Sequence, residues 1–450
     1  MTLKDIHNVY FIGIGGIGMS ALARYFEFIG KQVAGYDRVR TPLIDELMAC
    51  GIDVHFEDDL KAIAPQYLEP VHTLVVYTPA VPKAHSELDY FNKSGHRVMK
   101  RAEVLGLITK DIFCLAVAGT HGKTTTSSIL AHLLYEAGNP IIAFLGGISE
   151  DFNSNFVLNG NEYAVVEADE YDRSFLHLHP NVACITSMDA DHLDIYGSGE
   201  KLEESFRAFA SQIKPGGTLI VKSGLPIKGL TYGIEDGSDY EIKNIRIEQG
   251  TYVFDIQTPN ETVRDIRFNK PGQHNLLNGL AAFAMAVQTG SPTHRLAEAM
   301  ASFKGVERRF SYRLKNEHIV FIDDYAHHPT EIDAVYQAVV EMHPDARVLV
   351  VFQPHLFSRT QDFADAFAAS LSRFDSVLLL EIYPARELPI AGVDSAWLLE
   401  KIKNPNKKLI EKENILHEVR SQSPDILITM GAGDIGLEVE RIKSGLAYAS

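Results

Sequence analysis

Apolar residues gather in short runs, which are separated by longer stretches where they recur at helical spacing. The first runs cover residues 9–12, 32–36 and 73–77, and a helical pattern occupies residues 20–29. A short apolar run with polar flanks predicts a buried strand, and spacing of three and four residues predicts an amphipathic helix. Because strands and helices alternate, we expect a parallel sheet with helices on both faces.

The same alternation returns twice further along the chain. Expected strands of a second group lie at residues 113–117, 163–166 and 182–186, and expected helices at 205–213 and 275–288. Residues 230–268 alternate apolar and polar positions around turn residues, which predicts a small antiparallel sheet. Strands of a third group are expected at residues 319–322, 347–352, 377–381 and 426–430.

These three groups predict an α/β protein of three domains, with boundaries at residues 1–108, 109–312 and 313–450. The first and third domains are expected to be Rossmann-like. The central domain is expected to be a P-loop domain with a mostly parallel sheet and the small antiparallel sheet attached to it.

Composition restricts the class of protein further. The chain has 450 residues, 46% hydrophobic and 22% charged, as in a soluble protein with several cores. Its net charge of −17 argues against nucleic acid or an anionic membrane as the main partner. Cys50, Cys114 and Cys184 lie far apart and predict small core residues in a reducing compartment. Because no signal-peptide pattern and no apolar run of about 18 residues occurs, we expect a cytoplasmic protein.

The strongest chemical signal is Ala-Gly-Thr-His-Gly-Lys-Thr-Thr-Thr at residues 118–126, between an expected strand and an expected helix. Such a turn forms a phosphate cradle, because its backbone N–H groups and the helix dipole favour an anion. Lys123 would place its charge on the β- and γ-phosphates, and the Thr124 hydroxyl would bind Mg²⁺. Val117 replaces the first glycine of the usual P-loop. The segment nevertheless predicts a nucleoside-triphosphate site.

A second nucleotide signal is Gly13-x-Gly15-x-x-Gly18 after the first expected strand, with Asp37 at the end of the next. This turn is suited to a diphosphate, and Asp37 to a ribose hydroxyl, as in NAD-binding domains. The motif does not identify the nucleotide, so an NAD-dependent dehydrogenase is one alternative. Two nucleotide sites in succession favour an enzyme that consumes one nucleotide and uses the other as a handle on its substrate.

Acidic residues and a histidine follow strands of the second group. Residues 167–172 read Glu-Ala-Asp-Glu-Tyr-Asp, and residues 189–194 read Asp-Ala-Asp-His-Leu-Asp. Carboxylates beside a phosphate cradle are the hard ligands that Mg²⁺ prefers. We therefore expect Glu167 to bind the metal, whereas the residues leave open whether His192 ligates it or forms a hydrogen bond near it.

Polar clusters also follow strands of the third group, at residues 323–331, 352–360 and 383–387. This is the edge on which a doubly wound sheet binds ligands. Asn275 and Asn278 stand one turn apart at a helix start, where they either cap the helix or bind an adenine edge. His327 and His328 have no third His or Cys at ligand spacing, so we reject a zinc site.

Taken together, these motifs resemble the Mur ligase family. The resemblance covers nearly the whole chain, with motifs in the expected order at residues 13–20, 119–126, 167–172, 189–194, 274–278, 323–331 and 352–360. It implies an ATP- and Mg²⁺-dependent ligase of peptidoglycan precursor synthesis, which forms an amide through an acyl phosphate. Such an enzyme would act in the cytoplasm as a monomer or weak homodimer.

The resemblance also implies which residues form each site. The UDP-linked substrate would contact Gly15, Gly16, Ile17, Gly18, Asp37, Thr78, Pro79 and Ala80. ATP would contact Gly119, Thr120, His121, Gly122, Lys123, Thr124, Thr125, Asn275, Asn278, Arg309 and Asp324. The amino acid and the muramyl group would lie near Tyr325, His327, His328, His355, Arg359 and Arg386. The metal would be bound by Thr124, Glu167 and His192, and the catalytic residues would be Lys123, Glu167, His192 and Arg359.

Within the family, the chain looks most like the members that join L-alanine to the lactyl carboxylate of UDP-N-acetylmuramate. The alternative is the recycling members, which add the tripeptide L-Ala-γ-D-Glu-meso-diaminopimelate to the same sugar nucleotide. Those members usually lack the Gln-Pro-His and Ser-Arg-Thr that stand here at residues 353–355 and 358–360. One departure is Leu356, where many alanine-adding members carry arginine.

Overall fold

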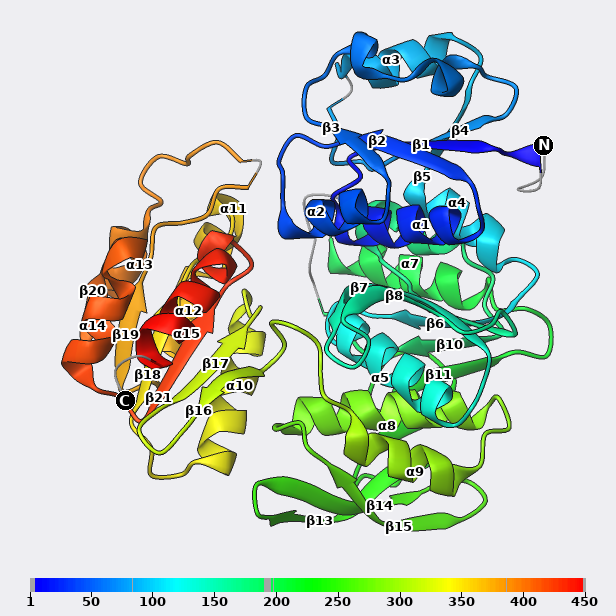
Figure 1. Cartoon of the computed structure of the whole chain (residues 1–450). Coiled ribbons are helices and arrows are strands. Elements are labelled where there is room, and N and C mark those ends of the chain that lie inside the picture. Colours follow the sequence, from blue (N-terminus) through cyan, green and yellow to red (C-terminus); the bar gives the residue numbers. More distant parts are fainter. Residues whose placement is uncertain (1–4, 83, 190–195, 197, 386, 448–450) are drawn as a thin grey trace. The chain divides into compact units, whose positions relative to one another are not determined.

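The structure is a computed structural model that describes residues 5–82, 84–189, 196, 198–385 and 387–447. The chain divides into two compact units. One unit comprises Met1–Arg246, Val253–Phe268 and Leu277–Lys304, and the other comprises Ile247–Tyr252, Asn269–Leu276 and Gly305–Ser450. In the described part of the chain, the strands form sheets of five, ten and six strands (Figure 1).

The five-stranded sheet is parallel and has the order β3-β2-β1-β4-β5. Its elements are β1 (Asn8–Ile12), α1 (Ile17–Phe28), β2 (Gln32–Tyr36), α2 (Pro42–Ala49), β3 (Asp53–His55), β4 (Thr73–Tyr77), α3 (Ser86–Lys93), β5 (Arg97–Lys100) and α4 (Arg101–Thr109). Alternate residues of β1 enter different cores, since Phe11 packs on the α1 side and Tyr10 on the α3 side. Figure 1 shows α1 and α4 on one face of this sheet and α3 on the other. The strand order reverses between β1 and β4, and a doubly wound sheet binds its ligand at the carboxyl ends of such strands.

The ten-stranded sheet has the order β15-β14-β13-β12-β11-β10-β6-β9-β7-β8. Its strands are β6 (Phe113–Ala118), β7 (Ile141–Ser149), β8 (Ser154–Leu158), β9 (Tyr163–Glu167), β10 (Val182–Ile185), β11 (Thr218–Lys222), β12 (Leu230–Ile234), β13 (Tyr240–Glu248), β14 (Thr251–Gln257) and β15 (Thr262–Phe268). The helices are α5 (Lys123–Glu136), α7 (Gly199–Ala210), α8 (Gln273–Val287) and α9 (Thr293–Ser302). Residues 230–268 therefore form strands that continue the central sheet at one end.

The first two sheets belong to one unit because α1 packs against β7 and β8. Tyr25 of α1 makes edge-on ring contacts with Phe144 and Phe156. Asn155 of β8 is buried and donates its amide to the Ile17 carbonyl, at 2.5 Å. A single hydrophobic core thus runs from one sheet into the next. The domain boundaries given above stay predictions.

The six-stranded sheet of the second unit has the order β16-β17-β21-β18-β19-β20, and only β16 pairs antiparallel. Its strands are β16 (Ser311–Lys315), β17 (Val320–Asp324), β18 (Val348–Phe352), β19 (Ser376–Leu379), β20 (Lys407–Leu409) and β21 (Ile426–Met430). Its helices are α10 (Pro329–Met342), α11 (Phe357–Asp362), α12 (Ala364–Leu371), α13 (Ser395–Lys401), α14 (Ile415–Gln422) and α15 (Val439–Ala447). Helices α10, α12 and α13 pack on one face, and α14 and α15 on the other.

The predicted α/β fold class is confirmed, but the expectation for one cysteine was wrong. Cys114 and Cys184 are buried, whereas Cys50 at the end of α2 is exposed.

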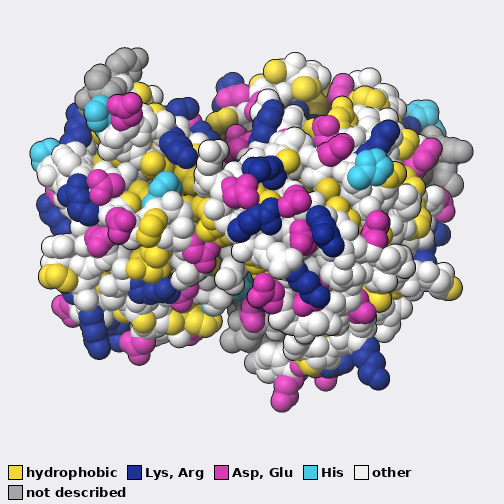
Figure 2. All heavy atoms as spheres, turned by 90° about the horizontal axis from the view of Figure 1, so that it is seen from below, with side chains coloured by type: hydrophobic (Ala, Val, Ile, Leu, Met, Phe, Trp, Pro, Cys, Tyr) yellow, Lys and Arg dark blue, Asp and Glu magenta, His cyan; other side chains and the backbone are white. Residues whose placement is uncertain are grey.

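Among the described residues, no helix combines the length and the apolar character needed to cross a membrane. On the face drawn in Figure 2, Lys and Arg side chains are interspersed with Asp and Glu.

Candidate active site

The turn between β6 and α5 has the backbone of a phosphate cradle. Gly119 and Gly122 have positive φ angles of 136° and 83°, and Gly122 caps the N-terminus of α5. A Cβ on Gly119 would lie 2.1 Å from Thr186 Oγ1, and one on Gly122 would lie 2.5 Å from Asn278 Oδ1. Both positions therefore require glycine, for conformation and for space. The segment after β10 anchors the turn, because the His121 N–H donates to Ser187 Oγ at 2.8 Å.

Lys123, the first residue of α5, forms a buried ion pair with Glu170. Its Nζ lies 2.8 Å from both Glu170 oxygens and 2.7 Å from the Gly119 carbonyl oxygen. Burial alone would lower the pKa of Lys123, but the carboxylates of Glu170, Asp169 and Glu167 outweigh it and raise that pKa. The ammonium group is therefore charged and held at the mouth of the cradle.

Thr124 and Glu167 place two hard oxygen donors side by side. The Thr124 hydroxyl donates to Glu167 Oε2 at 2.8 Å, and Glu167 ends β9 next to β6. Asp189 lies 3.6 Å from His121 Nε2. His192, predicted as a metal ligand and catalytic residue, lies outside the described residues. Within the part of the chain that the structure describes, no three His, Cys, Asp or Glu side chains are grouped to hold a metal ion.

The two asparagines of α8 differ in their contacts. Asn278 accepts a hydrogen bond from Thr126 Oγ1 of α5 at 3.2 Å and touches the Gly122 position, so it lies at the cradle. Asn275 donates its side-chain amide to the Pro271 carbonyl at 2.7 Å, near the start of α8. Thr120 and Thr125 are also buried at the cradle and in α5, respectively.

The residues predicted for the UDP-linked substrate converge at the carboxyl edge of the first sheet. The Gly15 N–H donates to Asp37 Oδ2 at 2.8 Å, and Gly16 is the N-cap of α1 before Ile17. A Cβ on Gly13 would lie 2.8 Å from Thr78 Cγ2, so the loop after β4 also meets this turn. Pro79 and Ala80 are exposed in that loop. Gly18 faces the guanidinium of Arg101, which the sequence analysis did not single out.

In the second unit, Asp324 at the end of β17 organises the backbone around it. Its two carboxylate oxygens accept hydrogen bonds from the N–H groups of Phe310 and Ala326, each at 2.7 Å. Burial raises the pKa of Asp324 to about 6, although Arg309 and these N–H groups oppose the shift. The Arg308 and Arg309 guanidinium groups lie 5.1 and 5.0 Å from the ring centre of Tyr325.

A cluster of aromatic and basic side chains lies beside Asp324 at the same sheet edge. The His355 ring lies 6.0 Å from the His327 ring and 5.8 Å from the Tyr383 ring, with which it is stacked. Arg359 Nη1 approaches His355 Nδ1 at 3.4 Å. Burial lowers the pKa of His327, with Glu331 opposing the shift. The two imidazoles and the guanidinium thus form a cluster of polar side chains at this edge.

Two further predicted residues differ from this cluster. His328 is the N-cap of α10, and its ring packs edge-on against Phe363. A helix cap therefore accounts for His328. Arg386 lies outside the described residues.

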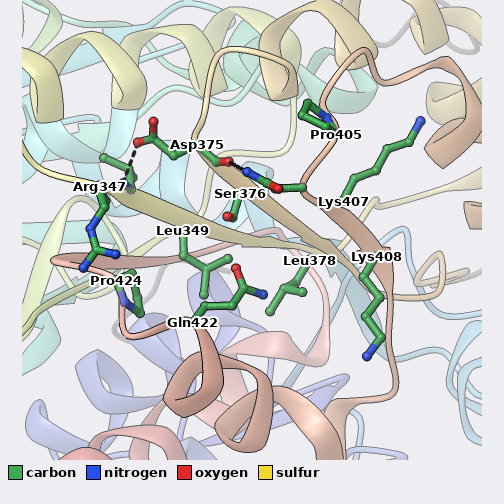
Figure 3. A pocket seen from close by; sticks show the side chains of 12 residues that line it. Arg347, Leu349, Asp375, Ser376, Leu378, Pro405, Lys407, Lys408, Gln422 and Pro424 are labelled. Carbon is green, nitrogen blue, oxygen red and sulfur yellow. Dashed lines mark hydrogen bonds between the residues drawn. The ribbon is translucent and has the colours of Figure 1, made fainter.

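The second unit also has a cavity of about 580 Å³, but on the opposite edge of its sheet, at the amino ends of β18, β19 and β20 (Figure 3). Its charged side chains serve the fold. Asp375 accepts a hydrogen bond from the Val348 N–H at 2.8 Å, and Lys408 pairs with Glu418 at 2.5 Å. In this unit, the carboxyl edge with Asp324, His327 and His355 is therefore the better candidate for ligand binding.

Three residues of these sites, Glu170, Arg101 and Ser187, were not predicted from the sequence. Glu170 lies in the acidic segment that was read as a metal site, and burial opposite a lysine is not visible in sequence. Arg101 and Ser187 are brought to the glycine turns only by the packing of distant strands and helices.

Comparison with known proteins gives a consistent result along the whole chain. Residues 8–112 match the model described as Mur ligase family, catalytic domain; residues 117–286 match the Mur ligase middle domain; residues 308–433 match the Mur ligase, glutamate ligase domain. The chain is 58% identical over 446 residues to UDP-N-acetylmuramate–L-alanine ligase of Flavobacterium psychrophilum, with 99% of each chain covered.

Solved structures agree in fold. UDP-N-acetylmuramate-alanine ligase of Thermotoga maritima matches with a TM-score of 0.84 at 27% identity, covering 98% of this chain and 100% of that one. The murein peptide ligase of Psychrobacter arcticus matches with a TM-score of 0.68 at 23% identity, covering 98% of both chains, and this likeness concerns the fold alone.

Proposed function

Because the chain belongs to the Mur ligase family, we propose that it is an ATP-dependent ligase that joins L-alanine to the lactyl carboxylate of UDP-N-acetylmuramate. The observation that carries the proposal is the full-length match at 58% identity to a relative of that name. This reaction is a step of peptidoglycan precursor synthesis. A cytoplasmic location and a monomer or weak homodimer stay predictions.

The chemistry requires activation of a carboxylate. Its oxygen becomes a leaving group when it attacks the γ-phosphorus of ATP, which forms an acyl phosphate and releases ADP. The α-amine of alanine then attacks the acyl carbon, phosphate leaves, and the amide forms with loss of a proton from the amine. Because charge gathers on the transferred phosphoryl group, catalysis rests mainly on positioning and on neutralising that charge.

Lys123 is the proposed cation for the β- and γ-phosphates. Its pair with Glu170 keeps the ammonium charged and fixes it beside the Gly119 carbonyl. Gly119, Thr120, His121 and Gly122 would line the phosphates through their backbone, with Thr125 behind them in α5. Asn275 and Asn278 would face adenine, Asp324 would lie near the ribose, and Arg309 would also contact ATP.

Mg²⁺ fits the donors that Thr124 and Glu167 offer, because a hydroxyl and a carboxylate 2.8 Å apart are hard ligands of the kind it prefers. His192 would serve a second Mg²⁺ ion. When bound, the ion would offset the negative charge of the phosphates.

Tyr325, His327, His355 and Arg359 are the proposed surroundings of the amino acid and the muramyl carboxylate. Arg359 is suited to hold the carboxylate of a free amino acid, because its planar fork matches that group. Its approach to His355 at 3.4 Å supports this role, since the ring limits the positions of the guanidinium.

One phosphate-release panel tests the proposal. The purified chain is mixed with UDP-N-acetylmuramate, ATP, Mg²⁺ and one amine, namely L-alanine, glycine, L-serine or L-Ala-γ-D-Glu-meso-diaminopimelate. We expect L-alanine to be preferred, with glycine and serine slower, since a methyl group contributes only about 1–3 kcal/mol of discrimination. Use of the tripeptide without L-alanine would identify a recycling ligase instead. Tight NADH binding without turnover on any amine would favour a dehydrogenase and contradict the proposal.

A further inference from the structure

Arg101, the first residue of α4, lies against the glycine turn of the first sheet. A Cβ on Gly18 would lie 2.8 Å from Arg101 Nη1 and 3.2 Å from its Cζ. Gly18 belongs to the first turn of α1, where the diphosphate of a nucleotide binds in a doubly wound domain. A residue larger than glycine at position 18 would therefore displace this guanidinium.

The same guanidinium reaches the acidic segment that follows β9. Arg101 Nη2 lies 3.5 Å from Asp169 Oδ2, and the two side chains are 23% and 36% exposed. The other oxygen of Asp169 accepts the Tyr171 N–H at 3.1 Å, which fixes the carboxylate. Asp169 stands two residues after Glu167, so Arg101 contacts both the glycine turn and the segment that carries the predicted metal ligand.

Among the described residues, Arg101 makes one polar contact, the 3.5 Å approach to Asp169, although its guanidinium carries five N–H donors. A half-buried guanidinium beside a glycine turn is well suited to an oxyanion, because its planar fork donates two parallel hydrogen bonds to phosphate oxygens.

We propose that Arg101 binds the diphosphate of the sugar nucleotide and that Asp169 orients its guanidinium. This inference rests on the proposed function, since it takes UDP-N-acetylmuramate as the substrate. The third glycine of the fingerprint then has a specific task in this chain: it makes room for an arginine from α4. Because Asp169 comes from the segment after β9, the diphosphate and the triphosphate sites share one charged contact.

Calorimetric titration of the full chain with UDP tests the assignment. Arg101→Gln should weaken UDP binding by about tenfold or more, the usual effect of losing a charge-assisted hydrogen bond. Arg101→Lys should recover part of the loss, because it restores the charge without the fork. The matched control is Lys110→Gln, which removes one exposed positive charge at the other end of α4 and should bind UDP like the parent.

Titration with uridine shows whether a loss of affinity concerns the diphosphate or the nucleoside. Binding of uridine should be equal in the parent and in Arg101→Gln, because uridine carries no phosphate. An equal loss for uridine and UDP would overturn the assignment, as would UDP binding in Arg101→Gln that matches the parent. In turnover assays, the KM for UDP-N-acetylmuramate should rise while the KM for ATP and kcat stay within about twofold of the parent.

Gly18→Ala tests the contact between the turn and Arg101. The added Cβ meets the end of a flexible side chain, so the variant should fold, and alanine favours the helix. It should weaken UDP binding about as much as Arg101→Gln does. In the double variant Gly18→Ala/Arg101→Gln, UDP affinity should be little lower than in Arg101→Gln alone. Additive losses would mean that residue 18 acts on the ligand directly, and they would contradict the proposal.

The two proposals fail in different ways. If the parent binds UDP, Arg101→Gln does not, and no amine promotes phosphate release, then the ligase function is wrong and the Arg101 assignment stands. If the ligase reaction proceeds and Arg101→Gln binds UDP normally, the Arg101 assignment alone is wrong.

Discussion

Replacing Lys123 should damage stability as well as catalysis, because of the residue it faces. The Lys123 side chain is 13% exposed and the Glu170 side chain is 0% exposed, with N–O distances of 2.8 Å. Lys123→Met leaves the Glu170 carboxylate buried without the ammonium ion, and breaking a buried pair in this way costs about 3–5 kcal/mol. For a unit of this size, that corresponds to a fall in melting temperature on the order of 10 °C.

The double variant Lys123→Met/Glu170→Leu separates the two roles of the lysine. Replacing both partners by apolar residues removes the buried charge, so calorimetry should show most of the lost melting temperature restored. Phosphate release should stay lower than in the parent by about 10²–10³-fold in both variants, since the cation aimed at the phosphates is missing. Lys201→Met on α7 is the matched control for loss of an exposed charge. A single variant that melts like the parent, or a double variant no more stable than the single, would refute the pairing argument.

Two further variants test individual carboxylates. Burial raises the pKa of Glu87 from 4.5 to about 7; the nearby Asp58 adds to this shift, and the hydrogen bond from Tyr10 opposes it. Because the folded protein holds this proton more tightly than the unfolded chain, Glu87 contributes fully to the free energy of unfolding below about pH 4.5. This contribution is lost as the pH rises through 7. Glu87→Gln should therefore raise the melting temperature at pH 8 and change it little at pH 5, and an equal effect at both pH values would count against this. The Glu167→Gln variant should require more Mg²⁺ for half-maximal phosphate release, because the hydroxyl of Thr124 would lose its carboxylate partner in the proposed metal site. Its calorimetric UDP binding should stay unchanged. An unchanged Mg²⁺ titration would mean that the Thr124–Glu167 contact is structural only.

Periodicity predicted the parts of the fold that are long and apolar. The strand predicted at residues 73–77 is β4, and the one at residues 426–430 is β21. Because parallel strands end at one edge, the same pattern placed the polar segments after β1, β6, β9 and β17 at ligand-binding edges. Short elements such as β3 and β20 escaped prediction, since three residues carry no recognisable period.

The starts of helices and the contacts between individual side chains were harder to predict from the sequence. The helix expected from residue 205 begins six residues earlier, at Gly199, because the Ser198 side chain accepts the Lys201 N–H and caps the helix there. From the sequence, Glu170 is predicted only as one acid of the metal-binding segment at residues 167–172. Its burial against Lys123 follows from the neighbouring positions of β6 and β9, which a single sequence does not reveal.

Leu356 differs in residue type from many alanine-adding relatives, but its backbone hydrogen bonds do not depend on the side chain. The sequence marks it as a loss, because many alanine-adding relatives carry arginine there. In the structure its φ of 71° lies in a region that L side chains rarely adopt. The Leu356 N–H donates to the Tyr383 carbonyl at 2.9 Å, and the Leu356 carbonyl accepts from Thr360 Oγ1 at 2.7 Å. These bonds fix the turn between His355 and Arg359 through backbone atoms, which leucine and arginine share. Leucine therefore offers no side-chain donor to the proposed amino-acid site, while the backbone bonds that fix the turn between His355 and Arg359 do not depend on the residue type.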